Sequence, residues 1–357
     1  MERANGTRRV RVILPIGALC VLACARPSPA PWPSTCGVPP PELTVAFLGD
    51  QGLGPDAVAV LELIRSRGAD AVLHSGDFDY GDDPDAWEAE IDAVLGADFP
   101  LFAAVGNHDE SAWEGPDGYQ AKLEARLRRI GIPWEGSAGV AAHIEWQGLS
   151  MVFVSPGIYQ TGDESAAYLR EHFSHSDCSW RIASWHKNQH LMQAGDKGDA
   201  VGWKTYEEAR RAGAIIATAH EHSYARTHLL SAFSTQSVSQ QFPPGSPLPI
   251  ALSQDDPTTP EDEGRSFAFV SGLGGSSIRD HEVSGRWFAS IYTLDEGASY
   301  GALFCTFHVR GDPRLARCWF EDVAGSVPDR FDVAAPTGRR AAPAAPRPAS
   351  ASSSGGS

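Results

Sequence analysis

Short apolar runs that end in glycine or a polar residue recur along the first two thirds of the chain. Runs of this length and ending are typical of buried strands in a sheet. Because the carboxyl ends of parallel strands meet at one edge of a sheet, we expect the residues that follow these runs to lie close together. The runs are Thr44–Leu48 before Asp50, Ala71–Leu73 before Asp77, Phe102–Val105 before Asn107, Ile182–Ala183 before His186, and Ile215–Ile216 before His220.

Helical patterns alternate with these runs up to about residue 220, and strand patterns predominate afterwards. This order predicts an α/β (α+β) fold in which two packed mixed β-sheets are flanked by helices. The expected helices are Asp56–Ser66, Pro84–Leu95, Gly118–Arg129, Glu164–Phe173 and Thr205–Ala212. The expected later strands are Phe267–Val270, Arg286–Thr293, Ala302–Val309 and Ala316–Phe320.

The polar residues after the apolar runs suit the binding of two metal ions. They form D-x-G, G-D-x-x-Y, G-N-H-D, a single His and H-x-H, in that order. Two ions about 3.5–4 Å apart can neutralise a phosphoryl group and activate a water. One such motif is weak evidence, whereas five in a fixed order are strong evidence. The motifs begin at Asp50, Gly76, Gly106, His186 and His220.

Between Asp50 and Arg226 these motifs resemble the calcineurin-like metallophosphoesterase superfamily, whose fold is an αββα sandwich. The tyrosine of the second motif is most similar to the purple acid phosphatase branch. The resemblance implies a metal-dependent hydrolase of phosphoric esters with a dinuclear centre. It assigns Asp50, Tyr80 and His222 to one metal, Asn107, His186 and His220 to the other, and Asp77 to a bridge between them.

This implied ligand set also constrains which metals would bind. A phenolate suits Fe(III), and the second position suits Fe(II), Zn(II) or Mn(II). Coordination to a high-valent cation would remove the phenol proton of Tyr80 and give a charge-transfer colour. The alternative is that Tyr80 is a packed aromatic residue. Many non-purple members carry a metal-binding His where this chain has Gly52, so Tyr80 is expected to replace that ligand.

His108 is the candidate catalytic residue. Adjacent residues point in different directions, so His108 can face the substrate while Asn107 holds a metal. In the family this His binds phosphate and assists departure of the ester oxygen, which suits a side chain that titrates near neutral pH. The alternative is a structural loop His. The nucleophile would be a metal-bound water or hydroxide, and the chain has neither a G-x-S-x-G motif nor a Cys with a suitable helper.

Other residues near the motifs have weaker assignments. His190 and Lys187 are candidates for substrate binding, although the spacing after His186 differs from that of purple acid phosphatases and an exposed loop His is the alternative. Ala219 stands where the family usually has Gly, and costs little if its backbone is extended. Tyr224 and Arg226 are expected to be structural supports.

Two further features lie close to the motifs or resemble a binding loop. His74 could orient a ligand from behind it. The run Ser271–Ser276 is rich in glycine but lacks the pattern of a phosphate-binding loop, so we expect a turn after a strand.

The formal net charge of -16 argues against nucleic-acid binding, because phosphate backbones require basic patches. An anionic substrate would therefore be attracted by the metals rather than by the charge of the whole protein. The expected partner is a small phosphorylated substrate.

The first residues of the chain have the form of an export signal. Basic residues precede a short apolar run, and Val21–Cys24 resembles a bacterial lipobox, in which Cys24 would carry a lipid. The alternative is an ordinary signal peptide that is removed with Cys24. We expect an exported protein of the cell envelope that contacts a membrane only through this lipid. A twin-arginine route is a further hypothesis that rests on the Arg pair alone.

This interpretation divides the chain into four parts. Residues 1–23 would be the signal peptide and 24–41 a Pro-rich linker. Residues 42–333 would form the catalytic domain, and 334–357, which are rich in Ala, Pro, Ser and Gly, a disordered tail.

Export would permit disulfide bonds. Cys305 and Cys318 flank a turn within two strand-like runs, which predicts a bridge across a hairpin. Cys36 and Cys178 would form the remaining pair. None of these cysteines has C-x-x-C spacing.

Three functions remain open from the sequence. The leading one is hydrolysis of phosphate monoesters, and the second is a phosphodiesterase or nucleotidase with the same metals. The third is a non-catalytic lipoprotein that binds partners at the cell surface. The third is disfavoured because competent donors fill all seven expected ligand positions.

Overall fold

The computed structural model describes residues 36–239, 242–243, 245–253 and 264–337. The expected signal peptide, the lipidation site Cys24, most of the Pro-rich linker and the tail from residue 338 lie outside the described residues. Within the described part, no helix has the length and apolar character needed to cross a membrane.

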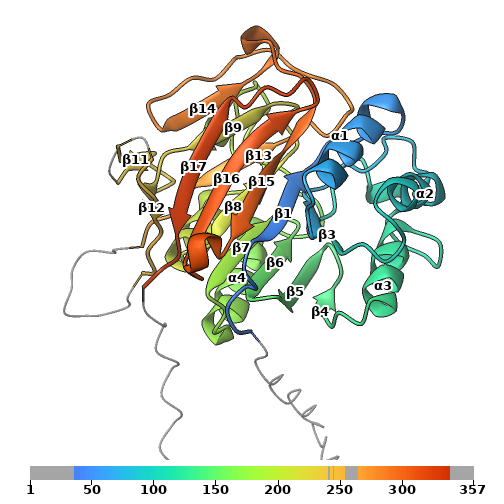
Figure 1. Ribbon diagram of the computed structural model, residues 1–357, viewed down its shortest axis with the longest axis horizontal. Coiled ribbons are helices and arrows are strands. Elements are labelled where there is room, and N and C mark those ends of the chain that lie inside the picture. Colours follow the sequence, from blue (N-terminus) through green and yellow to red (C-terminus); the bar gives the residue numbers. More distant parts are fainter. Residues whose placement is uncertain (1–35, 240–241, 244, 254–263, 338–357) are drawn as a thin grey trace, which may run out of the picture. The chain divides into compact units, whose positions relative to one another are not determined.

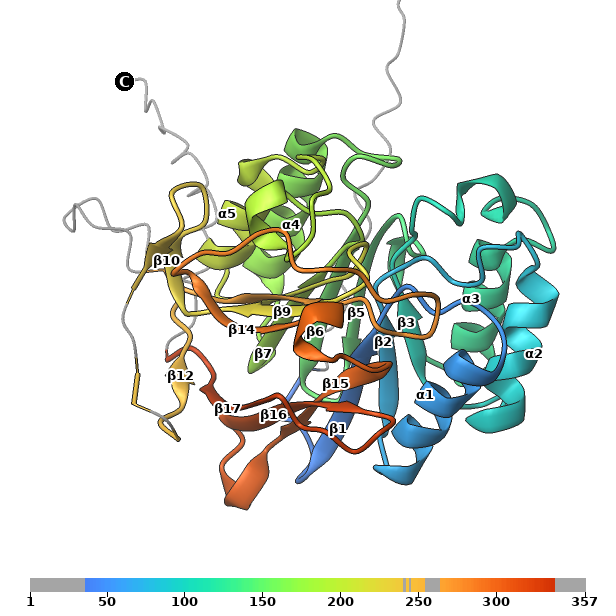
Figure 2. The same cartoon turned by 90° about the horizontal axis from the view of Figure 1, so that it is seen from above.

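Two large mixed sheets form the centre of the protein, as Figures 1 and 2 show. The strand order of the first sheet is β12 (Leu248–Pro249), β17 (Asp329–Ala334), β16 (Leu315–Asp322), β15 (Gly301–Phe307), β1 (Leu43–Leu48), β2 (Ala71–His74) and β3 (Leu101–Ala103). The order of the second is β14 (Phe288–Tyr292), β9 (Tyr224–Thr227), β13 (Ala268–Ser271), β8 (Ile215–Thr218), β7 (Trp180–Ser184), β6 (Leu149–Val154), β5 (Ala141–Trp146) and β4 (Glu135–Ser137). A small ribbon joins β10 (Leu230–Ala232) to β11 (Ser237–Val238).

Helices cover the outer face of each sheet. In Figure 2, α1, α2 and α3 lie beside β1, β2 and β3, and α4 and α5 lie over the second sheet. The bounds are α1 Pro55–Ser66, α2 Pro84–Val94, α3 Tyr119–Arg129, α4 Gly162–His175 and α5 Trp203–Arg211, with short 3-10 turns at η1 Glu110–Ala112, η2 His190–Met192, η3 Leu294–Glu296 and η4 Val309–Gly311. The predicted αββα sandwich is therefore confirmed.

Alternating side chains of the central strands build the three apolar layers. Along β1, Phe47 enters the core between the two sheets, where it meets Phe269 edge to face, whereas Leu48 packs under the helices α1 and α2. Along β6, Phe153 faces the inter-sheet core, and Val152 faces α4. A strand with both faces covered reads as a continuous apolar run, which is why these segments were recognisable as buried strands.

Two disulfides cross-link this sandwich. Cys305 and Cys318 are directly opposite on β15 and β16 and are bridged, as the sequence pattern predicts. Cys36 is bridged to Cys178, which precedes β7. The His308 ring is hydrogen-bonded to the carbonyl of Pro39 at 2.6 Å. The ordered body therefore begins before residue 42, and the last residues of the expected linker pack onto it.

A buried ion pair also connects the two sheets. The guanidinium of Arg226 on β9 donates to Asp329 on β17 at 2.6 and 2.9 Å, and the hydroxyl of Tyr224 donates to the same carboxylate at 2.7 Å. Arg226 and Asp329 are both buried. The expected supporting role of Tyr224 and Arg226 thus has a definite form, because they attach one sheet to the other.

Replacing Asp329 with Asn should lower the free energy of unfolding by about 3–5 kcal/mol, since the buried charge of Arg226 would lose its counter-charge. The matched control is Asp332→Asn, because Asp332 lies on the same strand but pairs with Arg317, whose side chain is 38% exposed. That change should cost no more than about 1 kcal/mol. Urea unfolding of both variants measures the difference, and equal losses would contradict the role given to Asp329.

Candidate metal centre

The expected metal ligands all follow strands that end at the same edge of the sandwich. Asp50, Asp77 and Asn107 follow β1, β2 and β3 of the first sheet, which pair in parallel. His186 and His220 follow β7 and β8 of the second sheet, which are also parallel. The two edges touch, because the hydroxyls of Ser75 and Ser184 are hydrogen-bonded at 3.1 Å. Ligands from both sheets are thereby brought into one site.

One group of donors gathers around Tyr80. The phenol oxygen lies 3.0 Å from Asp50 Oδ1 and 3.0 Å from His222 Nε2, and His222 Nε2 is 3.5 Å from Asp50 Oδ1. The other ring nitrogen of His222 is hydrogen-bonded to the hydroxyl of Ser277, which fixes the ring. These are the three residues that the sequence assigned to the first metal.

A second group gathers around His186. Its Nε2 lies 3.1 Å from Asp77 Oδ2 and 3.1 Å from His220 Nδ1. Its Nδ1 is 2.8 Å from the carbonyl of Ser75, so Nδ1–H donates there and Nε2 keeps a lone pair for a cation. The ligand atoms of Asp77, His186 and His220 all lie within 4.8 Å of one another. His186 and His220 are two of the residues expected at the second metal position, and the expected bridging residue Asp77 lies beside them.

The donor atoms fit two cations because many of them lack any other partner. Among the described residues, Asp50 Oδ2, Asp77 Oδ2 and Asn107 Oδ1 are buried and accept no hydrogen bond. Such groups are costly to bury unless something satisfies them. A carboxylate oxygen and two imidazole lone pairs that converge within 4.8 Å form a cradle for a positive ion.

The electrostatics of the site indicate the same requirement. Burial raises the pKa of Asp50 to about 7. Burial and the neighbouring Asp50 charge also raise the pKa of the Tyr80 phenol far above its ordinary value. Burial lowers the pKa of His222 to about 3, so its ring is neutral at pH 7. A cation among these atoms would ionise both acids and use the imidazole lone pair.

Four of the seven expected ligands have a left-handed backbone conformation. The φ angles are 56° for Asp50, 59° for Asp77, 60° for Tyr80 and 70° for His220. This conformation is unfavourable for residues other than glycine and costs of order 1–3 kcal/mol each. Such strain concentrates at functional sites, and here it turns each side chain sharply back toward the centre.

Asp109, the last residue of the G-N-H-D motif, positions the site without being one of the assigned ligands. Its carboxylate accepts hydrogen bonds from the backbone N–H groups of Gly106, Asp77 and Phe78 at 2.7, 3.0 and 2.8 Å. These bonds hold the loops after β2 and β3 together. A methyl group at Gly106 would lie only 2.1 Å from Asp77 N and Oδ1, so this approach requires glycine. The sequence motif contains Asp109, but spacing alone gave it no role.

Two residues with weaker assignments, Ala219 and His74, support the backbone around the site. Ala219 is not among the described residues with positive φ, so the methyl group is tolerated there as expected. The Cβ atom of Ala219 occupies the space that a side chain at position 49 would need, which explains why position 49 is glycine. The ring of His74 is buried and its Nδ1 accepts a hydrogen bond from Gly76 N–H at 3.1 Å, which supports the turn before Asp77.

The glycine-rich run is a turn, and it also forms a wall of the metal centre. It follows β13, as expected, and Gly272 packs so closely that a Cβ would lie 2.5 Å from Asp50 Oδ2. The backbone N–H of Ser276 donates to the carbonyl of Asp50 at 3.1 Å. Sequence pattern predicted the turn but not its contact with a ligand.

His108 lies at the solvent side of the centre. Its side chain is exposed, its ring centroid is 4.8 Å from that of Tyr80, and its backbone N–H donates to Asp77 Oδ1 at 2.9 Å. The ring is therefore free to meet a bound molecule while the backbone N–H orients the carboxylate of Asp77.

A cleft of about 630 Å³ opens beside the second ligand group. Its lining includes the expected ligands Asn107 and His220, the lysines Lys187 and Lys197, and the carboxylates Glu110 and Asp199. The ammonium group of Lys197 donates to the carbonyl of His220. Sequence reasoning named Lys187 but missed Lys197, which no motif marks. His190 is not among the lining residues, and its ring is hydrogen-bonded to the carbonyl of Lys197 at 3.1 Å.

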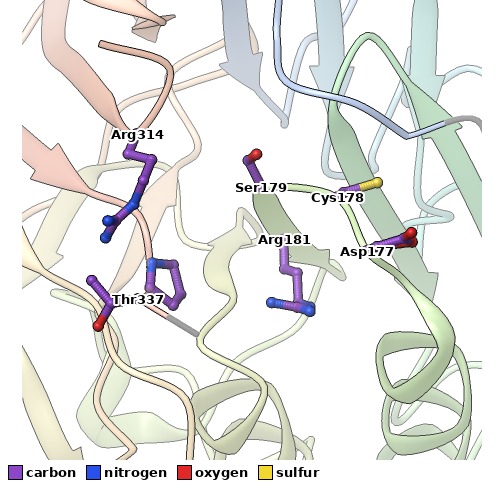
Figure 3. Close-up of a pocket in the computed structure, with 7 residues that line it drawn as sticks. Asp177, Cys178, Ser179, Arg181, Arg314 and Thr337 are labelled. Atoms are coloured by element: carbon purple, nitrogen blue, oxygen red, sulfur yellow. The ribbon is translucent and has the colours of Figure 1, made fainter. Parts of the chain in front are cut away.

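A second hollow, of about 320 Å³, lies at the opposite end of β7. Figure 3 shows Arg181 and Arg314 at this hollow, together with Asp177 to Ser179 and Thr337. Cys178 and Ser179 precede β7, whereas His186 follows it. This hollow is therefore separate from the metal centre.

Comparison with solved structures shows the fold. A purple acid phosphatase, PPD1, from yellow lupin (Lupinus luteus) seeds matches with a TM-score of 0.63 and 16% identity over 85% of this chain and 55% of that one. The chain thus spans little more than half the length of the lupin protein. GAP50, the anchor in the inner membrane complex of Plasmodium, matches with a TM-score of 0.53 and 10% identity over 85% of this chain and 91% of that one.

Comparison by sequence gives the family. None of the curated proteins compared with the chain matches it. The family model for calcineurin-like phosphoesterases matches residues 43–224, which is just over half of the chain and includes every expected metal ligand. The chain therefore belongs to the calcineurin-like phosphoesterase family, whose members are hydrolases of phosphoric esters.

Proposed function

We propose that this protein is an exported, metal-dependent phosphatase that hydrolyses phosphate monoesters. The observation that carries the proposal is the pair of adjacent donor groups with buried, unpartnered oxygen atoms, next to a cleft whose walls include two lysines.

The ligand atoms would hold one ion between Asp50, Tyr80 and His222 and another between Asn107, His186 and His220, with Asp77 reaching both. When bound, the two ions would supply positive charge for the phosphoryl oxygens and acidify a water. We propose Fe(III) on the Tyr80 side, because phenolate is a hard ligand, and Fe(II), Zn(II) or Mn(II) on the other. This choice would place the chain in the purple acid phosphatase branch.

The side chains around the ions would carry the remaining steps. Water attacks phosphorus, the ester P–O bond breaks, and the leaving oxygen needs a proton. His108 is the candidate donor, because its ring is exposed at the mouth of the centre while its backbone is fixed to Asp77. Lys197 and Lys187 are cationic residues that line the cleft, and they would pair with phosphoryl oxygens.

Lys187 and Lys197 line the cleft together with the carboxylates Glu110 and Asp199, so the preference for a monoester over a diester rests on the two metal ions and the lysines together. A phosphate monoester carries up to two negative charges at neutral pH, and a diester carries one. A site with additional fixed cations gains more from the dianion. A diesterase or nucleotidase with the same ligands is the competing function, and a binding lipoprotein is the third.

Export is proposed from the leader sequence and is supported by the two disulfides, which persist in oxidising compartments. We further propose that Cys24 carries a lipid and tethers the protein to an envelope membrane. Membrane fractionation of cells that express the full chain or its Cys24→Ser variant tests the tether, which is refuted if both partition alike.

The function is tested by assaying purified, metal-loaded protein with p-nitrophenyl phosphate, bis(p-nitrophenyl) phosphate and nucleotides across pH. We expect the monoester to have the highest kcat/KM, and a chelator to abolish the activity because no protein nucleophile replaces the metals. Preference for the bis ester would favour the diesterase. A protein that holds two ions and hydrolyses none of these would favour the binding lipoprotein.

Replacing His108 with Ala should leave the metal content unchanged and lower kcat by about 10²–10⁴-fold. The loss should be larger for an alkyl phosphate than for p-nitrophenyl phosphate, because nitrophenolate leaves readily without a proton. Steady-state kinetics with both substrates give this comparison. Equal losses would indicate that His108 binds phosphate without donating a proton, and unchanged rates would remove it from the mechanism.

Replacing Tyr80 with Phe removes the phenolate but preserves the ring that contacts His108. We expect the variant to fold as the wild type does, with the residues around position 80 unchanged. We also expect it to lose the visible charge-transfer band. Absorption spectra and metal analysis of both proteins provide the test. A variant that keeps its metals and its visible spectrum would end the purple-branch assignment and leave the dinuclear centre standing.

A further inference from the structure

A second cluster of metal-binding side chains lies on the outer face of the second sheet. Glu135 on β4 is directly opposite His143 on β5, and His172 projects from α4, which covers this face. The three residues are far apart in sequence and belong to no motif. Glu135 and His143 lie on the two strands furthest from β8 on that side of the sheet, away from the expected dinuclear centre.

The distances within the cluster are close to those of a coordinated ion. His172 Nδ1 is 3.5 Å from Glu135 Oε2, and the two imidazole centroids are 5.2 Å apart. One ligand atom from each residue lies within 4.8 Å of the other two. In a tetrahedral zinc site with bonds of about 2.1 Å, ligand atoms are about 3.4 Å apart, so small side-chain rotations would complete the geometry.

The surroundings hold both rings in place and keep them neutral. The ring of His172 packs on Tyr168 with centroids 4.0 Å apart, and Nε2 of His143 is hydrogen-bonded to Ser150 Oγ at 2.9 Å. Burial lowers the pKa of His143 to about 4 and also lowers the pKa of His172. Neutral imidazoles offer the lone pairs that a metal requires.

Exposure gives an ion a route to the cluster. The side chains of His143 and His172 are 13% and 10% exposed, whereas that of Glu135 is 43% exposed. A carboxylate at the surface with two imidazoles behind it leaves room for a water as the fourth ligand.

We propose that Glu135, His143 and His172 form an additional, mononuclear site for a zinc-like transition-metal ion that joins the β4–β5 edge of the second sheet to α4. Two imidazoles and one carboxylate are the ligand types that Zn(II) accepts in tetrahedral sites. The site does not depend on the proposed phosphatase activity.

The test is the number of ions bound by the full chain. Purified protein is saturated with Zn(II), freed of excess metal by gel filtration and analysed by elemental mass spectrometry. His172→Gln should hold one ion fewer per chain than the wild type, with an unchanged kcat for the phosphatase substrate. The matched control is His175→Ala, on the same helix but exposed, and it should hold as many ions as the wild type.

Glu135→Gln provides a second variant, because its exposed side chain can change without disturbing the core. It should also lose the ion, or bind it at least tenfold more weakly, by competition with a zinc-sensitive dye. The proposal would be overturned if the wild type and both variants held the same number of ions. It would also be overturned if the His175→Ala control lost as many ions as the two variants. The test compares the number of bound ions per chain between the wild type and the variants. Its result therefore does not depend on whether the dinuclear centre is catalytic.

Discussion

The carboxylate of Asp109 is the contact on which the metal centre depends. It accepts hydrogen bonds from three backbone N–H groups in the loops after β2 and β3, and these loops carry the expected ligands Asp77 and Asn107. Without such an acceptor, three buried donors would be unsatisfied, and only the pairing of β2 with β3 would hold the two loops near each other. The positions of ligands from two different strands are therefore set by one side chain that binds no metal in the assignment.

The convergence of the seven expected ligands could be predicted from sequence because each of them lies a few residues after one of five strands. Local spacing therefore encodes it, and the αββα order follows from the same strands. Helix ends were harder to predict. Helix α4 begins before the expected Glu164, because Thr161 and Glu164 form a reciprocal capping box.

Contacts between distant segments could not be read from spacing. Lys197 at the cleft, Gly272 behind Asp50, and the pairing of Glu135 with His143 against His172 all depend on how loops and strands are arranged in space. The family fold does not decide these details. A similar fold is found in GAP50, a structural neighbour that is described as an anchor. Function in this architecture resides in the side chains at the strand ends.

The left-handed backbone of Asp50, Asp77, Tyr80 and His220 also limits how this centre can change during evolution. Asparagine, aspartate and glycine adopt that conformation most readily, and β-branched residues almost never do. A library randomised at position 50 or 77 should consequently return Asn more often than Glu, although Glu preserves the charge. Backbone conformation, as much as ligand chemistry, then determines which metal sites can be reached from this one by single substitutions.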